Sequence, residues 1–252
     1  MARYTYGDSA LAAERLRLVA SMFEPATATF LRRSAPRSPR LAIDLGCGPG
    51  LTTRLVHEVT GASVTVGLDG SAAFVEMAAA DAPPGVSFMA HDATSVPFPV
   101  GPADLVYARL LLAHLPDPAS VVSDWSTMLT SGGIVMVDDL ETIETDEPVF
   151  RTYLDEVALA VVAAQGGALF VGPMLHDAPD PASTTRVDDR VVVFAPDVVV
   201  TASVFAMNLD VLTERGEVEP RPDLAAALRS IAGGARAREV RWHGRHLAWR
   251  RA

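Results

Sequence analysis

The spacing of apolar residues divides the chain into three parts, with changes near residues 41 and 147. In the first part, apolar residues between positions 9 and 33 recur at intervals that place them on one side of a helix. Ser9 stands where it can cap this helix, and Pro25 predicts that a second, short helix begins there. We therefore expect residues 1–38 to form a helical cap.

In the second part, short apolar segments alternate with helical patterns. The predicted strands cover residues 41–46, 63–69, 86–92, 103–110 and 134–140. The predicted helices between them cover residues 51–59, 71–80 and 118–129. Such alternation is typical of a parallel sheet with helices on both faces. The sequence therefore predicts an α/β protein with a doubly wound sheet.

The pattern after residue 147 is less regular. It predicts a helix over 148–165, a loop over 166–185, a strand over 190–194, a helix over 224–231 and an edge strand over 239–250. Residues 197–214 stay open between helix and strand, because their valines favour a strand and their later apolar spacing favours a helix.

A glycine-rich turn follows the first predicted strand, in the segment Asp44-Leu45-Gly46-Cys47-Gly48-Pro49-Gly50. Glycines at a strand-to-helix junction allow a tight turn and let a ligand approach bare backbone. The dinucleotide fingerprint G-x-G-x-x-G would need its third glycine at position 51, where this chain has leucine. The turn is therefore unlike one that holds a pyrophosphate.

The segment LAIDLGCGPGLTTRLV, which contains this turn, resembles the first motif of the class I methyltransferases that depend on S-adenosylmethionine (SAM). Later segments up to residue 140 resemble the family's other motifs in the same order, among them Asp69 in VGLDGS and Asp92-Ala93 in AHDA. The resemblance points to small-molecule methyltransferases of the UbiE, or menaquinone-methyltransferase, type. It implies a Rossmann-like, mostly parallel sheet of seven strands, with SAM as cofactor and S-adenosylhomocysteine as product.

The family also implies roles for individual residues. Asp69 would accept both ribose hydroxyls, since a carboxylate offers two acceptors to a vicinal diol. Asp92 and the backbone of Ala93 would contact adenine, and Asp44 would shape the glycine turn. The residues expected to bind the cofactor are Tyr6, Asp44, Gly46, Cys47, Gly48, Asp69, Gly70, Asp92, Ala93 and Arg109. Cys47 is expected as a small neutral filler, while the side chain of Arg109 could equally be structural.

Methyl transfer from a sulfonium is an in-line substitution that needs alignment and exclusion of water, and only some acceptors need a general base. His114 is the candidate base, although a histidine before Pro116 can also simply orient the loop. His176 is a weaker candidate for the acceptor site. We expect no metal, because Asp138 and Asp139 stand without the acid and amide partners that a metal-assisted mechanism would need.

The composition excludes several classes of substrate and of enzyme chemistry. The net charge is −10, which disfavours nucleic acid as substrate, and we interpret the arginines at positions 236–251 as charges on a solvated edge strand. The chain contains no lysine, which excludes Schiff-base lysines, attachment of pyridoxal phosphate and phosphate-binding P-loops. With one cysteine and no apolar segment long enough to span a bilayer, a cytoplasmic protein without membrane contact is expected, as a monomer or homodimer.

We therefore expect one methyltransferase domain over residues 1–252 that methylates a small-molecule acceptor at O, N or C. Its parts are the cap at 1–38, a SAM-binding core at 39–146, an insertion at 147–235 that shapes the acceptor site and a closing strand at 236–252. The cap and the loop 166–185 are expected to close over the site. Two alternatives stay open: a methyltransferase acting on RNA or protein, and a non-catalytic module that binds SAM.

Overall fold

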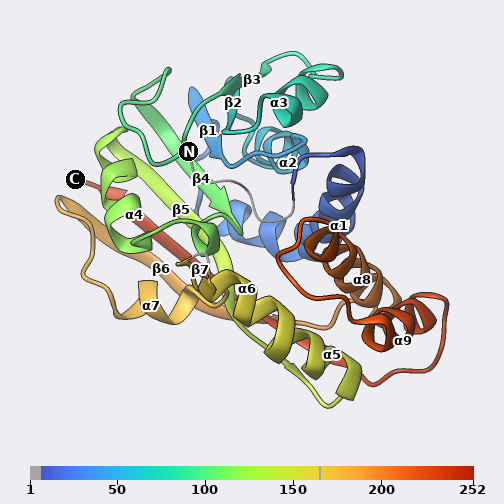
Figure 1. The fold of residues 1–252 in the computed structure, drawn as a ribbon. Coiled ribbons are helices and arrows are strands. Elements are labelled where there is room, and N and C mark those ends of the chain that lie inside the picture. Colours follow the sequence, from blue (N-terminus) through green and yellow to red (C-terminus); the bar gives the residue numbers. More distant parts are fainter. Residues whose placement is uncertain (1–6, 165) are drawn as a thin grey trace.

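A computed structural model describes residues 7–164 and 166–252. The strands are β1 (Leu41–Leu45), β2 (Val64–Asp69), β3 (Val86–Ala90), β4 (Ala103–Arg109), β5 (Leu129–Thr145), β6 (Thr184–Phe194) and β7 (Val240–Arg251). The helices are α1 (Ala10–Ser34), α2 (Leu51–Thr60), α3 (Ala72–Ala79), α4 (Pro118–Thr127), α5 (Pro148–Tyr153), α6 (Leu159–Ala164), α7 (Gly172–Asp177), α8 (Val198–Glu214) and α9 (Pro222–Ala232). A short 3-10 helix, η1 (Leu112–His114), and a π-helical segment, η2 (Leu154–Ala158), complete the described part (Figure 1).

The strands of the described residues form one seven-stranded sheet in the order β3-β2-β1-β4-β5-β7-β6. Strands β1 to β5 are parallel, and β7 runs antiparallel to both of its neighbours. This confirms the expected doubly wound, mostly parallel sheet. β7 lies between β5 and β6, so the prediction of an edge strand at 239–250 was wrong. The edge is β6, which belongs to the segment 147–235.

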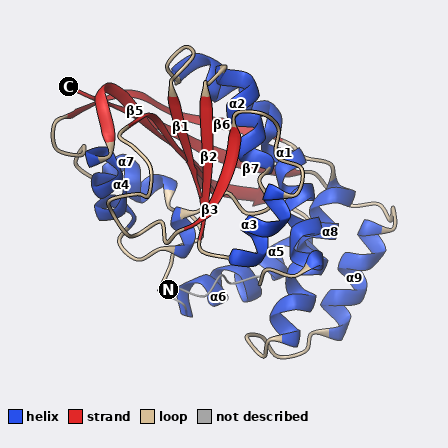
Figure 2. Ribbon diagram, turned by 90° about the horizontal axis from the view of Figure 1, so that it is seen from above, coloured by secondary structure: helices blue, strands red, loops and turns tan. Residues whose placement is uncertain are grey.

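Helices cover both faces of the sheet (Figure 2). Successive side chains of β1 point to opposite faces, as strand geometry requires. Ala42 packs in a core with the second half of α1 and with α2, whereas Ile43 packs in a core with α4 and α7. A third core lies beside the sheet and joins the first half of α1 to α5, α8 and α9. This lobe forms one side of the pocket described below.

α1 is a single helix of 25 residues, and the expected second helix starting at Pro25 does not exist. Ser9 caps it as predicted, since its Oγ accepts the backbone N–H of Ala12 at 3.3 Å. A proline inside a helix removes one backbone hydrogen bond and usually bends or ends it. Here the buried residues on both sides of Pro25, among them Phe23 and Phe30, pack on the rest of the protein and hold the helix together.

Residues 198–214, which the sequence left open, form the helix α8. Valine is a poor helix former, but nine α8 residues are buried, and burial outweighs so small a propensity cost. The expected loop 166–185 contains α7, which packs on β5 and β7. Along 7–164 and 166–252, no helix combines the length and the apolar character needed to cross a membrane.

The arginines near the C-terminus are not all solvated, contrary to expectation. Arg245 is 9% exposed and lies between two carboxylates, with its Nε 2.9 Å from Glu141 Oε2 and its Nη1 2.6 Å from Asp189 Oδ1. Arg241 pairs with Glu239 at 2.7 Å on the surface. These ion pairs neutralise part of the basic segment, so they weaken its case as a phosphate-binding patch.

Candidate functional site

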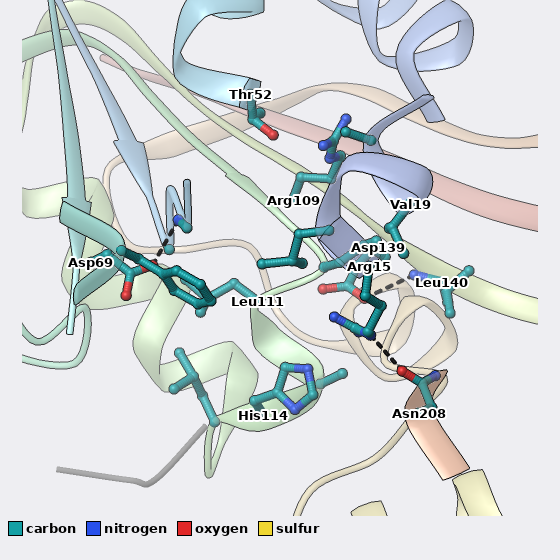
Figure 3. Close-up of a pocket in the computed structure, with 18 of the residues that line it drawn as sticks. Arg15, Val19, Thr52, Asp69, Arg109, Leu111, His114, Asp139, Leu140 and Asn208 are labelled. Atoms are coloured by element: carbon teal, nitrogen blue, oxygen red, sulfur yellow. Dashed lines mark hydrogen bonds between the residues drawn. The ribbon is translucent and has the colours of Figure 1, made fainter. Parts of the chain in front are cut away.

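A pocket of about 750 Å³ opens where β1, β2 and β4 end (Figure 3). The carboxyl ends of parallel strands are the usual place for a ligand in a doubly wound sheet, and the volume suits a drug-sized ligand. One end of the pocket is lined by the glycine turn and the loops after β2 and β3. The other end is lined by α1, β5, α5, η2, α8 and β7. We call these the turn end and the lobe end.

The glycine turn has the backbone conformation that the sequence suggested. Gly46 and Gly48 have φ angles of +64° and +51°, a region that side chains disfavour. A Cβ on Gly46 would also stand 2.8 Å from the side chain of Leu111. The N–H of Cys47 donates to the carbonyl of Leu68 at 3.1 Å, which ties the turn to β2. The turn therefore exposes bare backbone to the pocket.

Asp69 lies at the end of β2 and lines the pocket. Its Oδ2 accepts the N–H of Gly48 at 2.8 Å, and its Oδ1 accepts the N–H of Ser71 at 2.8 Å. Burial raises the pKa of Asp69, and the two N–H groups oppose that rise. A carboxylate has about four acceptor positions, so two remain for hydroxyl groups of a ligand. A Cβ built on neighbouring Gly70 meets nothing within 4 Å, so there is room beside the carboxylate.

Asp44 lies behind the turn and is not among the pocket-lining residues. Its Oδ2 accepts the hydroxyl of Thr53 at 2.6 Å, and burial raises its pKa to about 7. The carboxyl group therefore fixes α2 to β1 beneath the turn. Cys47 does line the pocket, and burial raises the pKa of its thiol, which keeps it neutral.

Asp92 and Ala93 line the turn end after β3. Asp92 Oδ1 accepts both the N–H of Thr94 at 2.9 Å and its hydroxyl at 2.7 Å, and these bonds hold the pKa of Asp92 below its usual value. The carbonyl of Ala93 accepts the indole N–H of Trp125 at 2.7 Å. The loop after β3 is therefore held by its own hydrogen bonds and by the indole of Trp125 in α4.

Arg109 and His114 both line the pocket, at the end of β4 and in η1. Burial, together with the positive charge of Arg15, lowers the pKa of His114 to about 4, so its ring is neutral at pH 7. His176 lies elsewhere: it belongs to α7, its Nδ1 is 2.7 Å from Asp189 Oδ2, and it does not line the pocket. Leu169 is the one residue of 166–185 on the pocket wall within the described chain, and closure of that segment over the site stays a prediction.

Sequence reasoning missed the polar residues of the lobe end. The Nε of buried Arg15 donates to Asn208 Oδ1, and Asn208 Nδ2 donates to the hydroxyl of Tyr153 at 2.8 Å. Asn208 is the chain's one asparagine, and its position within a mostly apolar segment was the signal that the sequence offered. These residues come from α1, α5 and α8, so no local motif brings them together.

Asp138 and Asp139, the two acids of β5, are both held by hydrogen bonds from the protein. Asp138 is buried away from the pocket, where its Oδ2 accepts the hydroxyls of Thr27 at 2.6 Å and Tyr107 at 2.9 Å. Asp139 lines the pocket and accepts the N–H groups of Leu112 at 3.2 Å and Leu140 at 2.9 Å. Burial raises its pKa to about 7.

Two further expectations concern Tyr6 and the binding of a metal ion. Tyr6, which was expected to bind the cofactor, lies outside the described residues. Among residues 7–164 and 166–252, no group of three or more His, Cys, Asp or Glu side chains is placed to hold a metal ion.

Comparison with known proteins matches the part of the chain that carries the turn end to a known domain. A family model described as a methyltransferase domain matches residues 43–137. The chain is 36% identical over 139 residues to a trans-aconitate 2-methyltransferase of Methylobacterium radiotolerans, a match that covers 55% of this chain and 50% of that protein. The chain thus spans about half the length of this curated relative. The menaquinone-type subgroup stays a prediction.

Solved structures agree in fold. A putative methyltransferase from Bacillus halodurans superposes with a TM-score of 0.60 at 16% identity, over 90% of this chain and 98% of that one. The plantazolicin methyltransferase BpumL in complex with S-adenosylhomocysteine superposes with a TM-score of 0.54 at 12% identity, over 96% and 89%. The sheet order, the glycine turn and the acid at the end of β2 agree with the methyltransferase domain that is matched at residues 43–137.

Proposed function

We propose that this pocket transfers a methyl group from SAM to a small-molecule acceptor. The observation that carries the proposal is the continuity of one pocket from the glycine turn and Asp69 to the lobe between α1, α5 and α8. SAM supplies, when bound, a methyl group that its sulfonium has already activated. The chain then needs only to hold donor and acceptor in line and to keep water out.

The turn end suits the donor. Asp69 would accept the ribose hydroxyls with its remaining lone pairs, and the backbone at Gly46 and Gly48 would lie against the methionine part. Asp92 and Ala93 would border the adenine, with Cys47, Gly70 and Arg109 completing the wall. Asp44 would act from behind, by holding the turn.

His114 is better suited to hydrogen-bond the acceptor than to deprotonate it. A base whose conjugate acid has a pKa near 4 takes up protons poorly at neutral pH. An acceptor that is already ionised, or a neutral amine, needs no such base. The name of the curated relatives, trans-aconitate 2-methyltransferase, makes a carboxylate the first acceptor group to assay.

The remaining expectations are part of the same proposal. Walls from α1 and α8 on the lobe end leave room for a small molecule, and the net charge of −10 disfavours RNA. We propose a cytoplasmic enzyme that works as a monomer or homodimer.

Calorimetric titration with SAM and S-adenosylhomocysteine, followed by a labelled-methyl assay on a panel of small acids, amines and phenols, tests this function. We expect micromolar or tighter binding of both ligands and label transfer to at least one acceptor class. Tighter binding of a nicotinamide dinucleotide than of SAM would contradict the proposal. Transfer to RNA or protein alone would support the alternative substrate.

A further inference from the structure

Asp139 is a buried acid on the pocket wall to which the proposed function gives no role. It is 1% exposed, and it stands one residue past the last pair between β4 and β5, which joins Arg109 and Asp138. Its Oδ2 accepts the N–H of Leu112 at 3.2 Å, and its Oδ1 accepts the N–H of Leu140 at 2.9 Å. A carboxyl group is therefore fixed in the wall of the pocket.

Asp139 lies where the two ends of the pocket meet. The loop after β4 begins beside the glycine turn, since a Cβ on Gly46 would stand 2.8 Å from the side chain of Leu111. The next residue, Leu112, donates its N–H to Asp139, and Leu140 on the other side lines the lobe end. The close-up shows Asp139 between Leu111 and Leu140 (Figure 3). A donor at the turn end and an acceptor at the lobe end would react beside this carboxyl group.

The backbone holds the carboxylate and leaves one of its acceptor positions open. The N–H groups of Leu140, Leu112 and Ala113 all donate to it, and each lowers its pKa. A carboxylate has about four acceptor positions, so three such bonds leave one for a ligand. Because these donors belong to the protein, the carboxylate is in position before an acceptor binds.

The surroundings of Asp139 set the pH at which it gains its charge. Burial raises its pKa to about 7, and the charge of Asp138 adds to the rise. The other ionisable groups nearby are Arg15 on α1, Arg109 on β4, His114 in η1, His176 on α7 and Arg245 on β7. Arg245 is engaged by Glu141 and Asp189. A general base works best when its pKa lies near the working pH, and this carboxyl group meets that condition.

The lobe end offers aromatic surface to the acceptor. The ring of Phe205 stacks on that of Tyr153 with centroids 4.1 Å apart, and it lies 6.2 Å from the ring of Trp242. All three side chains line the pocket. Aromatic side chains pack well against another ring, so this wall favours an aromatic acceptor.

We propose that Asp139 is a catalytic residue that accepts the hydroxyl proton of a phenolic acceptor. This inference rests on the proposed methyl transfer, because it places the donor at the turn end. A phenol has a pKa of about 10, so it keeps its proton at neutral pH and gains from a base at its hydroxyl group. A carboxylate acceptor is already ionised at that pH and has no proton to give.

The proposed step balances in atoms and charge. The methyl carbon forms a bond to the phenol oxygen while its bond to sulfur breaks, and the sulfur keeps the electron pair. The hydroxyl proton passes to the open acceptor position of Asp139. The results are a methyl ether, neutral S-adenosylhomocysteine and a protonated Asp139, which returns the proton to water before the next turnover.

The test compares the binding of p-cresol with that of its methyl ether, 4-methylanisole. The full chain is first saturated with S-adenosylhomocysteine, and both compounds are then titrated by calorimetry at pH 6 and pH 8. Only p-cresol can donate a hydrogen bond to Asp139, and it stays un-ionised at both pH values. We expect the affinity ratio of p-cresol to 4-methylanisole to rise at least about threefold between pH 6 and pH 8, as the carboxyl group gains its charge.

Variants identify the residue responsible. Asp139→Asn does not titrate, so the ratio should no longer change with pH, and kcat for p-cresol at saturating SAM should fall at least about 100-fold. In wild type, kcat should rise with pH through about 7. His114→Gln should keep the pH dependence of the ratio, because the pKa of His114 is about 4. Glu144→Gln is the matched control, since it changes an acid on the same strand that lies outside this pocket.

The outcomes separate the two proposals. Failure to bind S-adenosylhomocysteine would overturn the proposed function itself. If S-adenosylhomocysteine binds but p-cresol does not, or the ratio in wild type is the same at pH 6 and pH 8, only the role of Asp139 is overturned. A pH dependence that disappears in His114→Gln and persists in Asp139→Asn would also overturn it. If Asp139→Asn does not fold, the wild-type ratio and the His114→Gln ratio decide.

Discussion

The backbone N–H of Gly48 donates to Asp69 Oδ2 over 2.8 Å, so the acid at the end of β2 holds the turn at the end of β1. The second oxygen of the same carboxylate accepts Ser71 N–H at the start of α3. One side chain therefore fixes two loops of the turn end and still presents lone pairs to the pocket. This relationship makes Asp69 the first position to test.

Asp69→Asn should weaken binding of S-adenosylhomocysteine by about 1–3 kcal/mol, the range for hydrogen bonds to a charged group. The amide keeps the shape but has one acceptor oxygen in place of two. Calorimetric titration measures the change, and Glu76→Gln on the exposed face of α3 is the matched control. Unchanged affinity in a folded Asp69→Asn would mean that the ligand does not use this carboxylate.

Two glycine substitutions separate folding from binding. Gly46→Ala places a Cβ at φ +64° and 2.8 Å from Leu111, and we expect a loss of about 1–3 kcal/mol in the free energy of unfolding. Gly70→Ala has open space around its Cβ, so its stability should stay close to wild type, whereas its affinity for SAM should fall. Denaturant unfolding and titration measure the two effects. Tight SAM binding by Gly70→Ala would place the ligand away from the β2–α3 loop.

The affinity for SAM should depend on pH more strongly than the affinity for S-adenosylhomocysteine. Burial raises the pKa of Asp139 to about 7, so this carboxyl gains its charge as the pH rises from 6 to 8. A sulfonium favours the ionised form, whereas the thioether of the product has no charge. The ratio of the two affinities should therefore shift toward SAM with rising pH.

Asp139→Asn should reduce this shift, and the remainder should come from Asp44, whose pKa is also about 7. The stability of the free protein should change in the opposite direction and fall as the pH rises. Raised folded pKa values contribute stability that is complete below about 3.8 and is lost as the pH rises through about 7. A ratio that does not change between pH 6 and 8 would show that neither carboxyl senses the sulfonium.

The contact between α1 and β5 should matter for stability and not for binding. Thr27 donates its hydroxyl to Asp138 Oδ2 at 2.6 Å in a fully buried position. Thr27→Val removes that donor from a buried carboxylate, so we expect a loss of about 1–3 kcal/mol in the free energy of unfolding. Thr29→Val on the exposed side of the same helix is the control. A Thr27→Val protein as stable as this control would show that the hydrogen bond contributes nothing net.

The turn end could be predicted from the sequence because its residues are local to strand ends. Gly46, Asp69 and Asp92 lie at or just after the ends of strands that the apolar pattern reveals, and parallel strands bring their carboxyl ends together. The lobe end could not be predicted in this way. Arg15 and Asn208 are 193 positions apart, and their helices meet only through tertiary packing.

The sequence-based predictions that were wrong also failed because tertiary packing decided the outcome. Pro25 signals a helix start locally, and α1 continues through it because its flanks are buried. The valines of α8 favour a strand locally, but their burial in the lobe decides for a helix. Position in the sheet is likewise invisible to local patterns, so β7 was expected at the edge that β6 occupies.

The most direct test of the central claim is a single-turnover assay with methyl-labelled SAM and a panel of small acids, amines and phenols, read by mass spectrometry of both products. The account predicts one equivalent of S-adenosylhomocysteine for each methylated acceptor, with Asp69→Asn slowed at limiting SAM and Glu76→Gln unchanged. SAM that binds at Asp69 and stays intact across acids, amines, phenols, RNA and protein would contradict a methyltransferase and leave a SAM-binding module.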